Sequence, residues 1–331
     1  MSLRLVAMND ELVEPVCTAF ERVFGEARPP EVWRQIYRDS PDGSVGVICL
    51  NDANAVVGHY GATLHRVAGM GRDGAVFGQL RDVFTHPAVR GAGTGRSSLF
   101  ARMGQDFHGR FGGRDIDVLF GFGSDRHVRL GARLLGYRRL AGLEAWAREV
   151  PPPGHVAAAR LGALVPVARF SEEVDALWAQ RPAILAMAVP RTAAFLNWRF
   201  TPRPNRSYHG FRYDSFLAGG MAGYAIVAQD ADARQAGAEA RLADFRLPDD
   251  PGLRWDMWHQ LMDRLARSGV RRLTLIASAA VPEASCLPSL GCVPLAAELP
   301  WFPAYLPYGP EWGEPEFGTI CHLTMADGDI F

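Results

Sequence analysis

The fold of this chain is decided by a glycine-rich stretch, in which residues 78–103 read GQLRDVFTHPAVRGAGTGRSSLFARM. An apolar strand reaches a proline, crosses three glycines spaced two residues apart, and continues as a helix. Glycine lets the backbone turn tightly and approach a ligand, and the first turn of a helix carries unpaired N–H groups at the positive end of its dipole. Arg90 and Arg96 flank the glycines and add two positive charges. The stretch therefore predicts a site for a phosphate or pyrophosphate.

Three phosphate-binding patterns can be compared with this stretch. The Walker pattern ends in Gly-Lys-Ser/Thr and fails, because the chain contains no lysine. The dinucleotide-binding pattern Gly-x-Gly-x-x-Gly requires a glycine where Arg96 or Ser98 stands. The pattern Arg/Gln-x-x-Gly-x-Gly/Ala is met in register by Arg90, Gly93 and Gly95. A simple strand-to-helix turn without a ligand is the alternative.

A second motif follows the first at a suitable distance. An apolar strand over residues 117–122 leads to Ser124 and Asp125, and then to a helix closed by Leu135-Gly136-Tyr137. A glycine at that end suits a left-handed C-cap. Together the two motifs resemble the GNAT superfamily of acyl-CoA-dependent N-acyltransferases. The resemblance covers residues 76–137 at the level of motifs, and it implies an α/β fold with a mixed sheet (α+β in character).

The resemblance implies that coenzyme A, supplied as acetyl-CoA, binds at these two motifs. In the family the glycine loop binds the pyrophosphate, and two strands separate so that the pantetheine arm pairs with a free strand edge. Asp125 replaces the usual asparagine of the second motif and would repel phosphate if it pointed inward. The implied cofactor-binding residues are Val83, Phe84, Thr85, Arg90, Gly91, Ala92, Gly93, Thr94, Gly95, Arg96, Ser124 and Asp125.

The acid and base that many members of the family use are absent from this sequence. Ala132 stands where the family's tyrosine acid lies, five residues before the closing aromatic. Gln79 stands at a frequent position of the glutamate base, and an amide cannot take up a proton. Asp82 is nearby, but strand alternation predicts that it lies on the opposite face from Gln79.

Catalytic roles are therefore hypotheses for Tyr60 and His59, with His65 and His86 as further candidates and a structural role as the alternative for each. Alternation places Tyr60 and His59 on opposite faces of one strand, so at most one of them points into the pocket. A tyrosine still carries its proton at neutral pH, which favours Tyr60 as the donor to the leaving thiolate.

The second half of the chain repeats the element order of the first. Three prolines at 151–153 mark the break, and residues 240–247 and 290–292 correspond to the motif strand and to its Leu-Gly-Tyr closure. Asp249 and Asp250 replace the glycine loop and would repel a pyrophosphate. We therefore expect tandem GNAT-like folds: a coenzyme A-binding domain over 1–150, a linker over 151–165, and a degenerate copy over 166–331.

The composition is that of an ordinary globular protein, with 48% hydrophobic residues, 21% charged residues and a formal net charge of -1. This balance argues against a nucleic-acid partner or a polybasic membrane-binding surface. Five scattered cysteines without a Cys-x-x-Cys pair suit a reducing cytoplasm, and no metal site is expected. The first residues do not read as a signal peptide, and no apolar run has the length of a bilayer span.

The sequence thus predicts a cytoplasmic N-acetyltransferase that moves an acetyl or short acyl group from acetyl-CoA to a primary amine. The acceptor is expected to be a small molecule or a peptide. An acyl-CoA-binding sensor without turnover is the main alternative, because the usual acid and base are absent. A scaffold protein that keeps the fold without a ligand is a third possibility.

Overall fold

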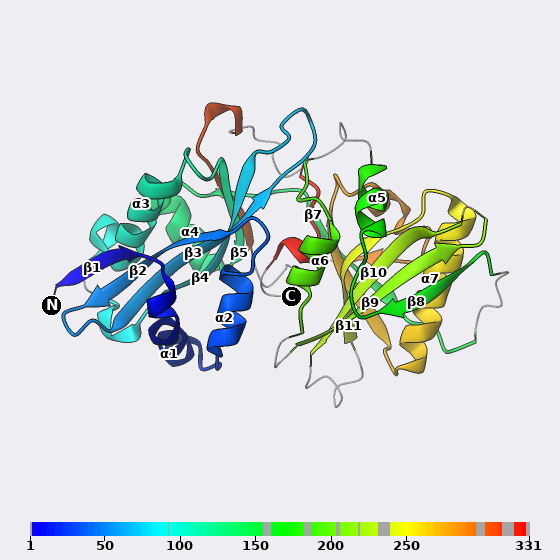
Figure 1. Cartoon of the computed structure of the whole chain (residues 1–331), viewed down its shortest axis with the longest axis horizontal. Helices are drawn as coiled ribbons and strands as arrows, with labels where there is room; N and C mark the ends of the chain where they lie inside the picture. Colours follow the sequence, from blue (N-terminus) through cyan, green and yellow to red (C-terminus); the bar gives the residue numbers. More distant parts are fainter. Residues whose placement is uncertain are drawn as a thin grey trace.

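The computed structural model describes residues 2–91, 93–154, 160–181, 187–202, 206–217, 219–230, 239–295, 302–312 and 321–328. In these ranges the chain forms two seven-stranded mixed sheets that lie side by side (Figure 1). The predicted mixed α/β fold, built from two similar halves, is confirmed. No helix within these ranges has the length and apolar character needed to cross a bilayer.

In the first half two helices follow the first strand, and three consecutive strands then lead to the glycine loop. Its strands are β1 (Leu3–Ala7), β2 (Ser44–Asn51), β3 (Val56–Arg66), β4 (Val76–Thr85), β5 (Val118–Gly123), β6 (Arg138–Arg139) and β7 (Leu143–Glu149). Its helices are α1 (Val13–Phe24), α2 (Pro30–Tyr37), α3 (Leu99–Phe111) and α4 (Asp125–Leu135), and short 3-10 turns are η1 (Asp10–Leu12), η2 (Pro87–Val89) and η3 (Gly95–Ser97).

The second half has an equivalent set of elements. Its strands are β8 (Gly162–Val167), β9 (Arg206–Ser215), β10 (Met221–Asp230), β11 (Glu239–Arg246), β12 (Arg272–Ser278), β13 (Val293–Pro294) and β14 (Phe302–Pro307). Its helices are α5 (Glu173–Ala179), α6 (Ala193–Arg199) and α7 (Pro251–Arg267), with 3-10 turns η5 (Pro282–Cys286), η6 (Pro310–Trp312) and η7 (Met325–Asp327).

Each sheet contains one strand from the other half of the chain. The first sheet has the order β1-β2-β3-β4-β5-β14-β6, and the second reads β8-β9-β10-β11-β12-β7-β13 from its β8 edge. β14 therefore takes in the first sheet the position that β7 takes in the second. The sheets do not divide at residue 150, because β7 precedes that point and β14 lies far beyond it. Hydrogen bonding to a free edge, and not position in the chain, decides to which sheet a strand belongs.

Helices cover both faces of the first sheet. α1 and α2 pack on the face that carries Ile48 and Leu50 of β2, and α3 and α4 pack on the face that carries Val47 and Cys49. This distribution follows from the alternation of side chains along a strand. The two faces therefore form separate hydrophobic clusters.

A shared hydrophobic core joins the two halves. Phe77 of β4, Tyr305 of β14 and Leu196 of α6 all belong to it. α2 and α6 are also linked by a reciprocal pair of hydrogen bonds. Gln35 Nε2 donates to the carbonyl of Trp198 at 2.7 Å, and Trp198 Nε1 donates to the carbonyl of Gln35 at 2.8 Å. The halves are thus packed as one body.

The exchange of strands predicts that neither half is stable without the other. Residues 1–150 expressed alone should aggregate or remain unfolded, because without β14 the edge of β5 is unpaired and the shared core is exposed. Circular dichroism and size-exclusion chromatography of the fragment measure this, and co-expression with residues 151–331 should restore a soluble complex. A monomeric fragment that unfolds cooperatively by itself would contradict the prediction.

Candidate functional site

β4 and β5 are parallel neighbours that separate after a short contact. They pair only from Phe77 to Gln79 on β4, opposite Val118 to Phe120 on β5. β5 is held on its other edge by β14 along its whole length. The edge of β4 from Leu80 to Thr85 that faces β5 therefore has no strand partner among the described residues. Val83, Phe84 and Thr85 lie along this open edge, as the sequence predicted.

The glycine loop follows the open edge directly. Gly91, Gly93 and Gly95 all have positive φ angles, of 117°, 89° and 56°. A Cβ at Gly93 would lie 2.4 Å from the carbonyl oxygen of Ser97, so this position also needs glycine for space. Ala92, which the sequence analysis included in the loop, lies outside the described residues.

The loop presents unused donors and cations to solvent. Within the described part of the chain, the backbone N–H groups of Gly93, Gly95 and Arg96 have no hydrogen-bond acceptor. Arg90 and Arg96 are exposed and have no acidic partner there, and Arg90 Nε donates to the carbonyl of Thr85 at 3.1 Å. Thr94 lies between these donors and is exposed as well. This combination suits an anion with several oxygen atoms.

The second motif forms the start of α4, directly after β5. Ser124 is the N-cap of α4, since its hydroxyl accepts the N–H of His127 at 3.3 Å. The carboxylate of Asp125 pairs with Arg129 at 2.7 Å and with Arg139 at 2.8 Å. These two cations offset the repulsion that an isolated aspartate would exert on a phosphate.

Asp82 lies at a β-bulge in the open part of β4. Gly61 pairs with Arg81 and His59 with Phe84, so β4 carries one extra residue at this point. Asp82 takes the extra turn with φ of 49°, in the left-handed region that aspartate tolerates better than most side chains. The predicted placement of Asp82 on the face opposite Gln79 is wrong, because the bulge interrupts the alternation of the strand.

The bulge turns the Asp82 carboxylate toward α1 and α2. It accepts hydrogen bonds from Tyr37 Oη at 2.9 Å and from Arg28 Nη1 at 3.1 Å. Burial alone would raise the pKa of Asp82, but Arg28, His59 and the bond from Tyr37 together hold this pKa below its usual value. The carboxylate is therefore ionised at neutral pH.

His59 lies on the same face as Asp82 and is fully buried. Its Nδ1 lies 2.8 Å from the carbonyl oxygen of Asp82, so Nδ1 must carry the proton and Nε2 the lone pair. Nε2 has no hydrogen-bond partner. Burial lowers the pKa of His59, and the ring is neutral at pH 7. Trp33 and Tyr37 of α2 pack edge-on against it.

Tyr60 points to the opposite face, beneath α3 and α4. Its hydroxyl contacts the hydroxyl of Tyr137 and lies 3.3 Å from His108 Nε2. Burial and the neighbouring Tyr137 raise the pKa of Tyr60. The prediction that Tyr60 and His59 face opposite ways is confirmed by these contacts. His86, the remaining candidate, caps η2 by accepting the N–H of Ala88.

The sequence predicts Tyr137 only as the end of a helix and does not indicate the contact that its phenol makes. Its ring lies over Gly131, where a Cβ would come within 2.0 Å of it. Tyr137 thus packs its ring on the residue that precedes Ala132, the position at which the family's tyrosine is absent. A glycine six residues before the closing aromatic is the one signal that could have indicated this contact.

The C-terminal segment covers the position of the family's usual base. Gln79 Nε2 donates to the carbonyl of Asp327 at 2.7 Å, and Gln79 Oε1 accepts from Arg81 at 2.6 Å. His65 belongs to the same buried group, with Nε2 3.3 Å from Gln79 Oε1. Gln79, Arg81 and His65 are almost inaccessible to solvent. An acceptor cannot reach this part of β4 while the segment is in place.

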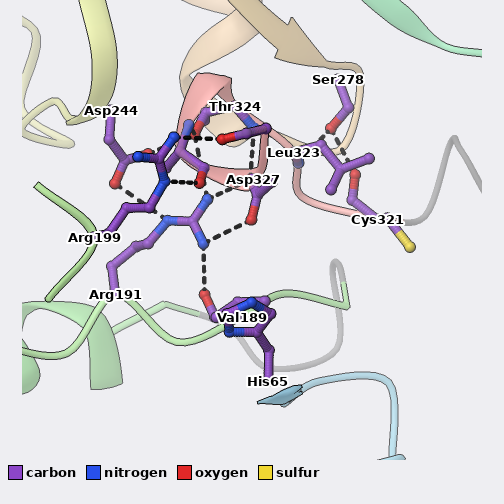
Figure 2. A network of polar contacts seen from close by, with 12 residues as sticks. His65, Val189, Arg191, Arg199, Asp244, Ser278, Cys321, Leu323, Thr324 and Asp327 are labelled. Carbon is purple, nitrogen blue, oxygen red and sulfur yellow. Dashed lines mark hydrogen bonds and ion pairs between the residues drawn. The ribbon is translucent and has the colours of Figure 1, made fainter. Parts of the chain in front are cut away.

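A buried ionic network holds this C-terminal segment against the second sheet. Arg191 pairs with Asp244 of β11 at 3.1 Å and with Asp327 at 2.5 Å, and Thr324 donates to Asp244 at 2.7 Å (Figure 2). None of these side chains is exposed by more than a few per cent. One guanidinium serves both carboxylates, and burial holds the pKa of Asp327 above its usual value. Removing Arg191 would leave the buried carboxylates without their cation.

The corresponding cleft of the second half is closed. β11 and β12 also separate after a short parallel contact, from Glu239 to Leu242 on β11. At the open end Arg246 donates to Glu283 at 3.1 Å, and Glu283 also pairs with Arg181 at 2.6 Å. These ion pairs join Arg246, at the end of β11, to Glu283 of η5, and Glu283 to Arg181.

The second half also lacks the free donors of the glycine loop. Asp250 caps α7 by accepting the N–H of Leu253 at 2.9 Å. Asp249 pairs with Arg246 at 3.0 Å, and Arg254 donates to the carbonyl of Asp249 at 2.6 Å. The groups at this helix start are thus bonded to one another.

The two halves together have the architecture of a known class of proteins. No family model matches the chain, and no curated protein matches it in sequence. A protein of unknown function from Enterococcus faecalis, described as a probable N-acyltransferase, matches with a TM-score of 0.68 and 14% identity over 93% of this chain and 73% of its own. A GCN5-related N-acetyltransferase from Anabaena variabilis matches with a TM-score of 0.67 and 14% identity over the same shares.

A third solved structure matches both halves at once. It is a tandem GNAT protein from the clavulanic acid biosynthesis pathway, with a TM-score of 0.58 and 17% identity over 93% of this chain and 99% of its own. The chain therefore has the fold of the GCN5-related N-acetyltransferases, in the tandem arrangement that the sequence predicted.

The burial of His65 between the halves predicts a loss of stability in acid. Burial, reinforced by the charge of Arg81, lowers the pKa of His65 to about 3, whereas an unfolded histidine titrates near 6.5. The unfolded state therefore takes up a proton first, and His65 should cost about 2 kcal/mol of unfolding free energy between pH 7 and pH 5. Urea unfolding of the parent and of His65→Gln measures this difference in pH dependence. The exposed His209 is the matched control, and equal slopes for parent and His65→Gln would refute the prediction.

Proposed function

We propose that this protein is an acyl-CoA-dependent N-acyltransferase whose single cofactor site lies in the first half. One observation carries the proposal: the open edge of β4 ends directly in a loop whose N–H groups at Gly93, Gly95 and Arg96 have no acceptor, and whose two arginines have no acidic partner, among the described residues. A pantetheine arm carries amide groups that can pair with such an edge, and a pyrophosphate needs such a loop. The GNAT fold of the chain supports the same assignment.

The order of these features along β4 gives the cofactor a direction. With the pyrophosphate at the loop after Thr85, the pantetheine arm runs back along Thr85, Phe84 and Val83. The thioester then arrives beside the bulge at Asp82. Ser124 and Asp125 close the other side of the cleft. An acetyl or short acyl group is the proposed cargo.

Two groups near the bulge are the candidates for proton transfer. The amine must lose a proton as it attacks the thioester, and the departing thiolate must gain one. His59 suits the first task, because it is neutral at pH 7 and its Nε2 lone pair is unused. Tyr60 suits the second, because its phenol keeps its proton and contacts the phenol of Tyr137. The two lie on opposite faces of β3, so at most one of them faces the thioester, and water is the partner in the other transfer.

The remaining assignments follow from the same site. The acceptor is proposed to be a primary amine of a small molecule or peptide. The unit around the second sheet, which contains β7 to β13, is proposed to be a copy that does not bind coenzyme A, with Arg246 and Glu283 paired beyond the point where β11 and β12 separate. All five cysteines are free thiols, which supports a reducing compartment.

Gly93→Val tests the cofactor loop. Gly93 has a positive φ and no space for a Cβ, so valine must distort the loop and should weaken coenzyme A binding at least tenfold, or by about 1.4 kcal/mol or more. Arg90→Glu should act in the same direction through charge. Isothermal titration calorimetry measures the affinity, and Gly109→Ala is the control because Gly109 of α3 has open space around it.

The same titration tests the second half. We expect one coenzyme A per chain, since the second cleft is closed. If folded Gly93→Val binds coenzyme A as tightly as the parent, the glycine loop is not the pyrophosphate site. If two coenzyme A molecules bind per chain, the second half also binds the cofactor.

Tyr60→Phe tests the proton donor. Turnover should fall by about 10²-fold with coenzyme A affinity unchanged, as expected for the loss of general-acid assistance. Release of free thiol from acetyl-CoA in the presence of an amine panel measures turnover. Unchanged turnover in Tyr60→Phe would make water the proton source. If the parent binds coenzyme A but acylates none of the amines, the result would favour the alternative of an acyl-CoA-binding sensor without turnover.

A further inference from the structure

Asp82 is the one carboxylate on the open part of β4, and its backbone is strained within a strand. Three non-glycine residues among the described ones have positive φ, and the other two, Asn54 and Met70, lie in loops between strands. A strained residue inside a strand is maintained by its surroundings and is often found at functional sites. Here the strain has a definite result, because it moves the carboxylate to the face of α1 and α2.

The carboxylate of Asp82 still has capacity to bind a donor. Oδ2 accepts from Tyr37 at 2.9 Å and from Arg28 at 3.1 Å, and Oδ1 accepts only a longer bond of 3.3 Å from the same nitrogen of Arg28. An ionised carboxylate offers about four acceptor positions. One position on Oδ1 therefore has no partner among the described residues. The side chain of Asp82 is 10% exposed and that of Arg28 16%.

The rest of this face of β4 is inaccessible. Gln79 and Arg81 are covered by the C-terminal segment, and their exposure is 2% or less. Asp82 is thus the polar group by which a molecule outside can reach β4 from this side. Tyr37, which binds Asp82, also lines a hollow of about 170 Å³ whose other lining residues are Met8, Asn9, Asp10, Trp33, Arg34, Arg38 and Ser44.

We infer that Asp82 binds the ammonium group of the acceptor amine and positions it for attack on the thioester. A carboxylate with a free acceptor position suits a primary ammonium, which has three donors and no acceptor. Asp82 is a positioning residue in this account, and proton transfer belongs to His59. The inference rests on the proposed function, because the direction of coenzyme A places the thioester at the bulge.

Two variants of the same ion pair test the inference through effects of opposite sign. Asp82→Asn removes the charge while keeping a side chain that tolerates the left-handed backbone, and should weaken amine binding by about 10- to 100-fold. Arg28→Gln removes the cation that competes for the carboxylate and should strengthen amine binding by about threefold or more. A merely structural ion pair would weaken binding in both variants, because both break the same contact.

The measurement is calorimetric and does not require turnover. Protein saturated with coenzyme A is titrated with benzylamine, tryptamine, spermidine and glucosamine, and with benzyl alcohol as the uncharged counterpart of benzylamine. At least one amine should bind the parent, and benzyl alcohol should bind more weakly than benzylamine. Asp106→Asn on α3, which breaks an exposed pair with Arg110, is the control and should change nothing.

The outcomes separate this inference from the proposed function. Failure of coenzyme A to bind the parent, seen before any amine is added, would remove both. Three results would remove the role of Asp82 and leave the cofactor site intact, provided that coenzyme A binds. They are no binding of any amine, equal amine affinity in the parent and Asp82→Asn, or a change of amine affinity in the same direction in both variants.

Discussion

The open edge of β4 depends on a strand that comes from the other end of the chain. β14 pairs with β5 along its full length, from Val118 to Gly123. β5 can therefore leave β4 after three residues without exposing its own backbone groups on both sides, which would be costly for a buried strand. The exchange of β7 and β14 thus does more than link the halves. It stabilises the separation of strands in which the cofactor is proposed to bind.

The bulge at Asp82 has a second effect on the same strand. It interrupts regular pairing with β3 just where the thioester is proposed to lie, and it places the carboxylate on the face of α1 and α2. On that face Tyr37 and Arg28 hold the carboxylate, and His59 is bound to the carbonyl of the same residue. A cation-binding group and a neutral imidazole therefore lie together at one irregular point of the backbone.

The two halves share one strand arrangement but differ in the groups at the point where the strands separate. Both have strands that separate after a short parallel contact, between β4 and β5 and between β11 and β12. In the first half the cleft ends in glycines with free N–H groups, whereas in the second Asp250 uses a helix donor and Arg246 is bonded to Glu283 across the opening. The difference lies in a few side chains at the ends of the strands. The second half instead supplies β14 and the segment that covers Gln79.

The sequence by itself determined the features that depend on local spacing: the glycine loop from Arg90 to Arg96, the capped start of α4, and the repeat of the two halves. Local patterns are sufficient there because turns, caps and alternation act over a few residues. Only the tertiary structure decided the exchange of β7 and β14, because any strand with a suitable edge can pair with any other. It also decided the orientation of Asp82, because one extra residue in a strand moves the side chains that follow to the opposite face of the sheet. A prediction from alternation alone therefore places Asp82 on the wrong face. The contact of Tyr137 with Tyr60 joins residues 77 positions apart, and such contacts arise from packing that no local pattern contains.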